Sequence, residues 1–152
     1  IKHYDNDNIY PLLPLLSQEF PNWTLDKIKN YVKIIISKKS DVAGMLVAQN
    51  EAKYYVGLLI YTFQSISSEL IGNTKKSQFE NGIVVENLIA SSPILQKQVF
   101  FLLTESIVKI GKKNNCKFIE LPRIDETYEL IKEKYNNQIT HYNSFRIFIK
   151  LD

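Results

Sequence analysis

The segment covering residues 83–121 constrains the fold of this chain most strongly, because it predicts a strand, a long helix and a second strand in direct succession. Residues 83–90 form an apolar run typical of a buried strand. Ser91-Ser92-Pro93 then supplies a strong helix start, with a serine at the N-cap and proline at the first helical position. The helix expected over 93–113 carries its apolar side chains on one face and ends in a segment rich in glycine and asparagine.

The remaining elements follow from hydrophobic periodicity and from turn residues. Pro14 would strain a helix interior, so the first helical segment, which starts near residue 9, is expected to be short or kinked. The polar segment 65–81 is expected to be a long loop. The other expected elements are, in chain order, a strand at 1–4, a helix at 24–38, a hairpin of strands 45–48 and 54–63, a strand at 117–121, a helix at 125–135 and one or two strands within 138–151.

The predicted order of elements is β-α-α-β-β-β-α-β-α-β. Strands that cluster first and then alternate with helices indicate an α/β (α+β) fold, in which helices cover a mixed sheet. A length of 152 residues fits one domain, 1–152, and allows a sizeable core without disulfides or structural metal. The only cysteine, Cys116, excludes an internal disulfide and a multi-cysteine metal site.

Several function classes are disfavoured by composition. No apolar run approaches the roughly 20 residues that span a bilayer, and the first residues lack a signal-peptide pattern. We therefore expect a cytoplasmic protein without a membrane partner. A net charge of +3 with only two arginines, Arg123 and Arg146, argues against a nucleic-acid partner. His3 and His141 lack metal-ligand spacing, so no metal site is expected.

The order of elements resembles that of the GNAT superfamily of acyl-CoA N-acetyltransferases over nearly the whole chain. Met45-Leu46-Val47-Ala48, a polar turn and Tyr55-Val56-Gly57-Leu58-Leu59-Ile60 are similar to the family's central hairpin, including the glycine early in its second strand. Leu88-Ile89-Ala90-Ser91-Ser92-Pro93 lies where the family places its acyl-CoA strand and the start of its acyl-CoA helix. The resemblance implies a central, mostly antiparallel sheet flanked by helices, with acetyl-CoA or another acyl-CoA as co-substrate.

The family's phosphate loop, Gln/Arg-x-x-Gly-x-Gly/Ala, is not kept in this chain. The alignment puts Ile94 at the Gln/Arg position and Lys97 and Val99 at the two glycines, which normally let the pyrophosphate approach the backbone closely. A helix N-terminus still offers unpaired N–H groups and a positive dipole end; the alternative is a plain N-cap under a structural helix. The cofactor-binding residues implied by the resemblance are Leu88, Ile89, Ala90, Ser91, Ser92, Ile94, Leu95, Gln96, Lys97 and Gln98.

Acetyl transfer to an amine needs a base for the ammonium and an acid for the leaving thiolate. Glu86 lies in the buried strand, where several family members carry a base glutamate, and its apolar neighbours predict partial burial and a raised pKa. Its alternative role is a carboxylate on the open face of the strand, paired with a lysine. Tyr128 is the nearest match to the family's acid tyrosine, three residues before the aligned position, which Ile131 occupies; Tyr135 and Tyr142 are substitutes. The alternative for each is an ordinary half-buried tyrosine.

Three functions stay open at this point. The first is an N-acetyltransferase that moves an acetyl group directly to a small-molecule or peptide amine. The second is a catalytically degenerate GNAT-like binding or regulatory domain, with a homodimer as one arrangement, which the missing glycines favour. The third is an unrelated α/β binding domain, against which a V-shaped splay between the strands around 83–90 and 117–121 would count. For an acceptor site, Phe20-Pro21-Asn22-Trp23 and the segment 65–81 are the candidates, although aromatics at that spacing are more often core packing.

Overall fold

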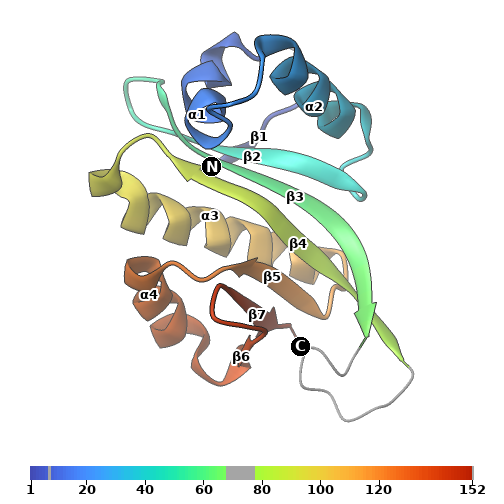
Figure 1. Cartoon of the computed structure of the whole chain (residues 1–152). Coiled ribbons are helices and arrows are strands. Elements are labelled where there is room, and N and C mark those ends of the chain that lie inside the picture. The colour runs from blue at the N-terminus through green and yellow to red at the C-terminus, as the bar shows by residue number, and fades with distance from the viewer. Residues whose placement is uncertain (7, 68–77, 152) are drawn as a thin grey trace.

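The computed structural model describes residues 1–6, 8–67 and 78–151, and these form a seven-stranded sheet with four α-helices (Figure 1). The strand order is β1-β2-β3-β4-β5-β7-β6, in which β4 and β5 are parallel and all other neighbours are antiparallel. The predicted mixed, mostly antiparallel sheet is thus confirmed. The elements are β1 (Lys2–His3), the 3-10 helix η1 (Tyr10–Leu12), α1 (Leu13–Glu19), α2 (Leu25–Ser37), β2 (Ala43–Gln49), β3 (Tyr55–Ser67), β4 (Phe79–Ala90), α3 (Pro93–Lys113), β5 (Phe118–Pro122), α4 (Asp125–Tyr135), the 3-10 helix η2 (Asn136–Gln138), β6 (Ile139–His141) and β7 (Arg146–Lys150).

The first two helices begin as their sequences predict. Pro14 lies at the start of α1 rather than inside it, because a 3-10 turn precedes the helix. As a result α1 is only seven residues long, in agreement with the short first helix expected from Pro14. At the start of α2, the Thr24 hydroxyl accepts a hydrogen bond from the backbone N–H of Lys27 at 3.2 Å, and this cap satisfies one of the helix's unpaired donors.

The α3 helix runs over the residues that the sequence predicts, from Pro93 to Lys113. Asn115 ends the segment with a φ of 57°, a left-handed conformation that asparagine tolerates well. Although α3 is long, none of the helices in the described part of the chain is both long and apolar enough to cross a membrane.

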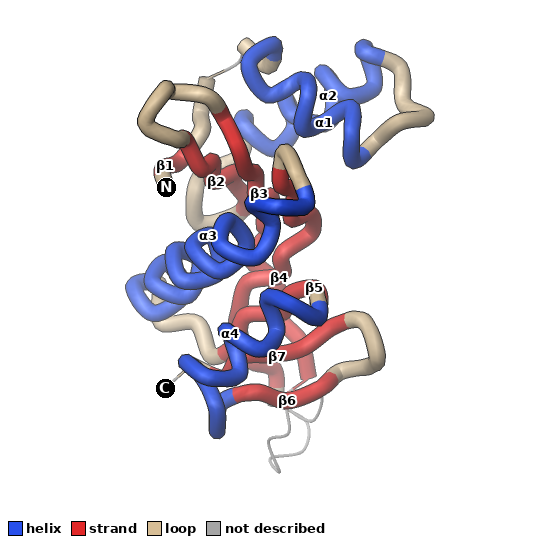
Figure 2. The backbone as a smooth tube through the Cα atoms, turned by 90° about the vertical axis from the view of Figure 1, so that its left-hand side faces the viewer, coloured by secondary structure: helices blue, strands red, loops and turns tan. Residues whose placement is uncertain are grey.

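The helices cover the sheet in two layers. The α1 and α2 helices pack on one face through a core that includes Leu16 and Val32, whereas α3 and α4 pack on the other through a core that includes Leu103 and Ile131. Figure 2 shows α3 and α4 lying together over their face, apart from α1 and α2. Burial of both faces explains why the strand interiors are almost entirely apolar.

Two strands are longer than their sequences suggest. The expected loop 65–81 is wrong at both of its ends, since β3 continues to Ser67 and β4 begins at Phe79, and these two residues pair across the strands. Backbone pairing between the strands therefore overrides the polar composition of these ends. Residues 68–77 of the expected loop lie outside the described part of the chain.

The parallel strands β4 and β5 separate after a short pairing. Only residues 82–84 of β4 pair with β5, the last pair being Val84 with Glu120, although β4 continues to Ala90 and β5 to Pro122. The two strands thus form the V-shaped splay considered above (Figure 1). Just beyond the vertex of this V, the pairing of β4 with β3 shifts by one residue, so that Glu86 is an extra residue in a β-bulge.

Candidate functional site

The splayed half of β4 presents an open backbone edge. Ser91 donates its N–H to the carbonyl of Val56 at 2.9 Å, which fixes the phase of the antiparallel hydrogen bonds between β3 and β4. Because these bonds alternate along a strand, the backbone groups of Leu88 and Ala90 point away from β3, toward the gap between β4 and β5. The Ala90 carbonyl accepts a hydrogen bond from the side-chain amide of Gln18, on α1, at 3.0 Å.

A cleft of about 180 Å³ adjoins this edge. Its lining comes from α1 and, much later in the sequence, from β4 and the adjoining start of α3. The lining residues are Gln18 and Glu19 of α1, Leu88, Ile89 and Ala90 of β4, and Ser92, Pro93, Gln96 and Phe100 at the start of α3. Six of the ten residues expected to bind the cofactor line this cleft or adjoin it directly: Leu88, Ile89, Ala90, Ser91, Ser92 and Gln96.

The first turn of α3 is open to solvent and lacks a side-chain cap. Ser92 occupies the N-cap position, as expected, but its hydroxyl makes no cap hydrogen bond, and no acidic residue lies in the first turn. The other four cofactor candidates are exposed on this turn and the next: Ile94, with 91% of its surface accessible, Leu95, Lys97 and Gln98. The helix therefore presents backbone N–H groups and one lysine, which suits an anionic group.

Val99 stands at one of the two aligned glycine positions, and its side chain faces the sheet. A Cβ atom added to Gly57 of β3 would lie 2.2 Å from Cγ1 of Val99, so Gly57 makes the room in which Val99 packs. Val99 is buried accordingly, with 6% of its surface accessible. Its bulk thus lies under the helix and away from the exposed first turn.

Glu86 is exposed, and the prediction that it is partly buried is wrong. Alternation along β4 puts Glu86 on the face of Val84, with Thr62 and Gln64 of β3, and the β-bulge puts Asn87 on that face as well. The carboxylate accepts hydrogen bonds from the Thr62 hydroxyl at 2.9 Å and from the Gln64 amide at 3.2 Å. Glu86 is therefore held in place by two neutral donors on β3.

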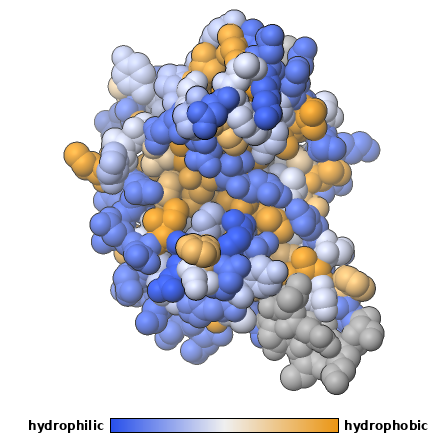
Figure 3. All heavy atoms as spheres, viewed as in Figure 1, coloured by the Kyte–Doolittle hydropathy of each residue, from blue (hydrophilic) through white to orange (hydrophobic). Residues whose placement is uncertain are grey.

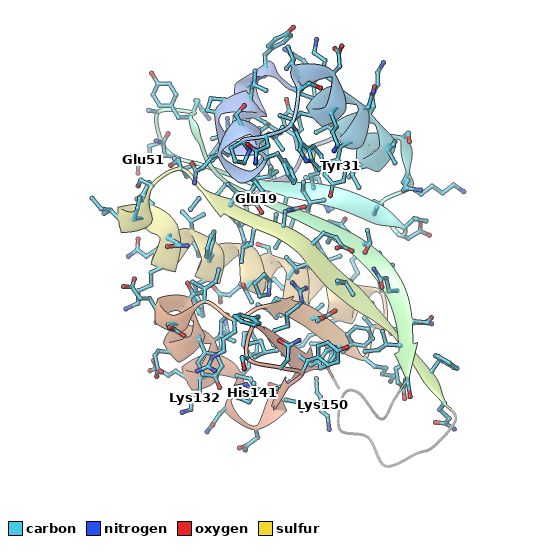
Figure 4. The ribbon with its side chains drawn as sticks, in the orientation of Figure 1. Glu19, Tyr31, Glu51, Lys132, His141 and Lys150 are labelled. Carbon is cyan, nitrogen blue, oxygen red and sulfur yellow. The ribbon has the colours of Figure 1, made fainter. Side chains whose placement is uncertain are left out.

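A second polar group lies beside Glu86 and joins β4 to both N-terminal helices. The Tyr31 hydroxyl, on α2, donates to Asn87 Oδ1 at 3.1 Å, and the Asn87 amide donates to Glu19 on α1 at 3.3 Å. Burial is the main cause of a raised pKa of Tyr31, and the negative charges of Glu86 and Glu19 raise this pKa further. Figure 4 shows Glu19 and Tyr31 near each other between the two helices and β4. The sequence singled out none of Gln18, Glu19, Tyr31 and Asn87, because their partners lie 56 to 72 residues away.

Tyr128, on α4, faces the core and contacts a histidine. Its hydroxyl is 3.0 Å from Nε2 of His141 on β6, and the guanidinium of Arg123 lies over its ring, 4.7 Å from the centroid. Tyr128 belongs to the core cluster on the α3 and α4 side, whereas Glu86 contacts residues on the α1 and α2 side. The two candidate catalytic residues thus flank the V from opposite faces of the sheet.

The two alternative tyrosines have different surroundings. Tyr135 is buried, and burial raises its pKa. Tyr142 is 47% exposed and packs against the ring of Phe148. Neither makes the direct contact with a second titratable ring that distinguishes Tyr128.

The aromatic residues between α1 and α2 are stacked on one another. The rings of Phe20 and Trp23 are 4.1 Å apart and nearly parallel, and Tyr31 packs edge-on against both. All three are partly buried against the α1 and α2 core. In the space-filling view, hydrophobic residues gather in a band between the helices α1 and α2 and the C-terminal strands (Figure 3). Within the described ranges, no group of three or more histidine, cysteine or carboxylate side chains could hold a metal ion.

Comparison with known proteins identifies this architecture. No protein-family model and no curated protein sequence matches the chain, but solved structures do. A GNAT-family acetyltransferase from Staphylococcus aureus Mu50 is 12% identical, with a TM-score of 0.59 and coverage of 99% of this chain and 97% of the other. The aminoglycoside 6'-N-acetyltransferase AAC(6')-Ih from Acinetobacter baumannii is 11% identical, with a TM-score of 0.62 and coverage of 85% and 84%. A transcriptional regulator from Bacillus halodurans C-125 is 14% identical, with a TM-score of 0.65 and coverage of 91% of both chains. The chain therefore has the GNAT fold, as the order of its elements predicted.

Proposed function

We propose that this GNAT-fold chain is an N-acetyltransferase that transfers the acetyl group of acetyl-CoA directly to an amine. The observation that carries the proposal is the open backbone edge at Leu88 and Ala90, which adjoins the uncapped start of α3 within one cleft. An extended chain with amide groups, such as the pantetheine arm of CoA, can add to such an edge as a further strand does. The pyrophosphate would then lie at the N-terminus of α3, near Lys97.

In the proposed reaction, the acceptor amine attacks the thioester carbonyl, the C–S bond breaks, and CoA leaves as a thiolate. Glu86 takes the proton that the acceptor ammonium loses before attack, and Tyr128 supplies the proton that the thiolate gains. The attacking nitrogen loses a second proton as the amide forms, and this proton returns Tyr128 to its neutral form. The Glu86 carboxylate is exposed, so an acceptor amine can reach it from solvent. Glu19 adds a second negative charge near it, which favours a cationic acceptor.

The direct test combines binding and turnover. Acetyl-CoA binding is measured by isothermal titration calorimetry, and CoA release is followed with spermidine, L-lysine and a tetrapeptide with a free N-terminus as acceptors. We expect Glu86→Gln to lower turnover at least 10-fold and to leave acetyl-CoA affinity within about threefold, because general-base catalysis contributes roughly 10²–10⁴-fold. Glu51→Gln, at an exposed site in the β2–β3 turn (Figure 4), is the matched control and should behave like the wild type. Equal turnover of Glu86→Gln and wild type would remove Glu86 from the mechanism.

The second candidate is a catalytically degenerate GNAT-like module. The absence of both aligned glycines favours it, since Lys97 and Val99 stand in their place. A thermal shift separates the two candidates. A ligand at about a hundred times its dissociation constant stabilises the folded state by about 2.7 kcal/mol, which corresponds to roughly 5–10 °C in melting temperature for a domain of this size. No shift with acetyl-CoA or CoA up to millimolar concentration would favour the module.

A further inference from the structure

Arg146, at the start of β7, spans the vertex of the V. Its Nε donates to Glu120 Oε1 on β5 at 2.8 Å, and its Nη2 donates to the Val85 carbonyl on β4 at 2.7 Å. Both side chains of the ion pair are mostly buried, with 26% of Arg146 and 14% of Glu120 accessible. One guanidinium therefore connects three strands of the sheet.

The position of this contact is where ordinary strand pairing stops. The last pair between β4 and β5 is Val84 with Glu120, so the Val85 carbonyl is the first acceptor that lies beyond the paired segment. Arg146 supplies the donor that β5 no longer offers. The planar fork of arginine suits this task, because it can satisfy a carboxylate and a carbonyl at the same time.

The ion pair lies on the same face of the sheet as Glu86. Side chains alternate along a strand, and Phe118 and Phe148 form a small core cluster with Val84 on the face that bears α1 and α2. Glu120 is two residues from Phe118, and Arg146 is two residues from Phe148, so both share that face. The Glu86 carboxylate, bonded to Thr62, is on this face as well.

The Val85 carbonyl belongs to the peptide bond that leads into the bulge residue Glu86. A hydrogen bond to that carbonyl restrains the peptide plane, and the plane sets the direction in which the Glu86 side chain leaves the strand. Glu120 neutralises Arg146, so the restraint brings no unpaired buried charge to the site.

We propose that Arg146 is a positioning residue for acyl transfer, which fixes the Val85–Glu86 peptide at the vertex of the splay and thereby aims Glu86 at the acceptor amine. This inference rests on the proposed acetyltransferase function for its catalytic part. The restraint on the peptide itself holds whether or not the chain is an enzyme, and the two parts can be measured separately.

The experiment compares Arg146→Met and Arg146→Lys with the wild type. Lys134→Met is the matched control, since it breaks the Lys134–Glu105 salt bridge between α4 and α3, on the opposite face of the sheet. Amide hydrogen exchange of the peptide covering residues 83–90 reports the restraint. Steady-state turnover with acetyl-CoA and the best amine of the panel above reports catalysis.

We expect Arg146→Met to speed exchange in residues 83–90 and to lower kcat by roughly 10- to 100-fold, with the KM for acetyl-CoA within threefold, because a small misplacement of a catalytic group has that effect. Arg146→Lys should recover part of the rate, since lysine keeps the charge but cannot make both hydrogen bonds. Lys134→Met should match the wild type in both measurements. If Arg146→Met does not fold, Glu120→Gln replaces it, because loss of the carboxylate charge weakens the hold on the guanidinium.

Three outcomes would overturn the proposal. Unchanged exchange in residues 83–90 of Arg146→Met would show that the guanidinium does not restrain the peptide. A KM for acetyl-CoA that rises in step with the fall of kcat/KM, with kcat constant, would show a cofactor-binding role instead. Equal effects of Lys134→Met would show a general loss of stability.

If the wild type neither binds acetyl-CoA nor acetylates any amine, the proposed function fails. Hydrogen exchange of residues 83–90 alone then decides whether Arg146 holds the peptide.

Discussion

The two halves of β4 satisfy their backbone hydrogen-bonding groups in different ways. Residues 82–84 pair with β3 on one side and with β5 on the other, whereas residues 85–90 have a strand neighbour only at β3. On the open side of the second half, side chains provide the partners, Arg146 for the Val85 carbonyl and Gln18 for the Ala90 carbonyl. Strand pairing on both sides therefore stabilises the first half, whereas side chains provide the partners on the open side of the second.

This difference separates residues that maintain the fold from residues that are available for binding. The paired half is enclosed by apolar side chains, and Ile83 is fully buried there. The open half carries Glu86 and adjoins the cleft. Changes in the two halves should thus act on different measurements, and the following predictions test that separation in order of decreasing effect on stability.

Truncation of one apolar side chain in each half gives the largest contrast. Ile83→Ala should lower the free energy of unfolding by about 2–5 kcal/mol, because it leaves a cavity in a fully buried site. Leu88→Ala should cost roughly 1 kcal/mol, since Leu88 is only partly buried, but it should weaken acetyl-CoA binding measured by calorimetry. Urea denaturation gives both free energies. If Ile83→Ala and Leu88→Ala lost equal stability and both bound acetyl-CoA as the wild type does, the two halves of β4 would not differ in function.

A methyl group added at each of two glycines gives the next contrast. In Gly82→Ala, the new Cβ would lie 2.4 Å from the ring of Phe118, which is fully buried, so the cost should be about 1–3 kcal/mol of stability. In Gly57→Ala, it would lie 2.2 Å from Val99 and push the start of α3 away from β3. We expect a similar loss of stability there, accompanied by a loss of acetyl-CoA affinity that Gly82→Ala lacks. The opposite pattern of affinities would place the cofactor at the paired half.

The ionisation of Tyr61 at alkaline pH should have the smallest effect on stability. Tyr61 lies opposite Val85, and burial raises its pKa from 10.0 to about 12. Its folded pKa exceeds its unfolded pKa, so its contribution to stability is complete below pH 10 and is lost as the pH rises toward 12. Urea denaturation at several pH values should show a flatter decline in Tyr61→Phe than in the wild type. Tyr54→Phe, at an exposed tyrosine, is the control and should decline as the wild type does. An identical decline in wild type and Tyr61→Phe would contradict the role given to Tyr61.

The sequence predicted the elements whose signals are local. The bounds of α3 follow from the serine and proline at its start and from its apolar face, and both ends agree with the structure. The order of strands and helices was also sufficient to predict the mixed sheet and the fold. The ends of β3 and β4 were missed, because Ile66 and Phe79 are the only apolar side chains among these paired ends and the pairing depends on the neighbouring strand.

The arrangement of the site was less predictable, for a physical reason. The position of Glu86 depends on a bulge, which arises from the mismatch between two strands and leaves no mark in the sequence of one. Arg146 and Val85 are 61 residues apart, and no local pattern signals a hydrogen bond between them. Chemical reasoning could thus select the residue types, whereas the fold determined which of them meet.

The bulge at Glu86 has one more consequence, which concerns how β4 should be compared with other strands. Before the bulge, odd-numbered residues such as Ile83 and Val85 face α3; after it, even-numbered residues such as Ala90 do. The one extra residue thus changes the residues that face α3 from odd-numbered to even-numbered ones. Deleting Glu86 would leave one regular alternation through both segments, in which the remaining side chains keep their present faces, and would remove the bulge together with its carboxylate. An alignment that crosses this point without a one-residue gap would assign core residues to the surface.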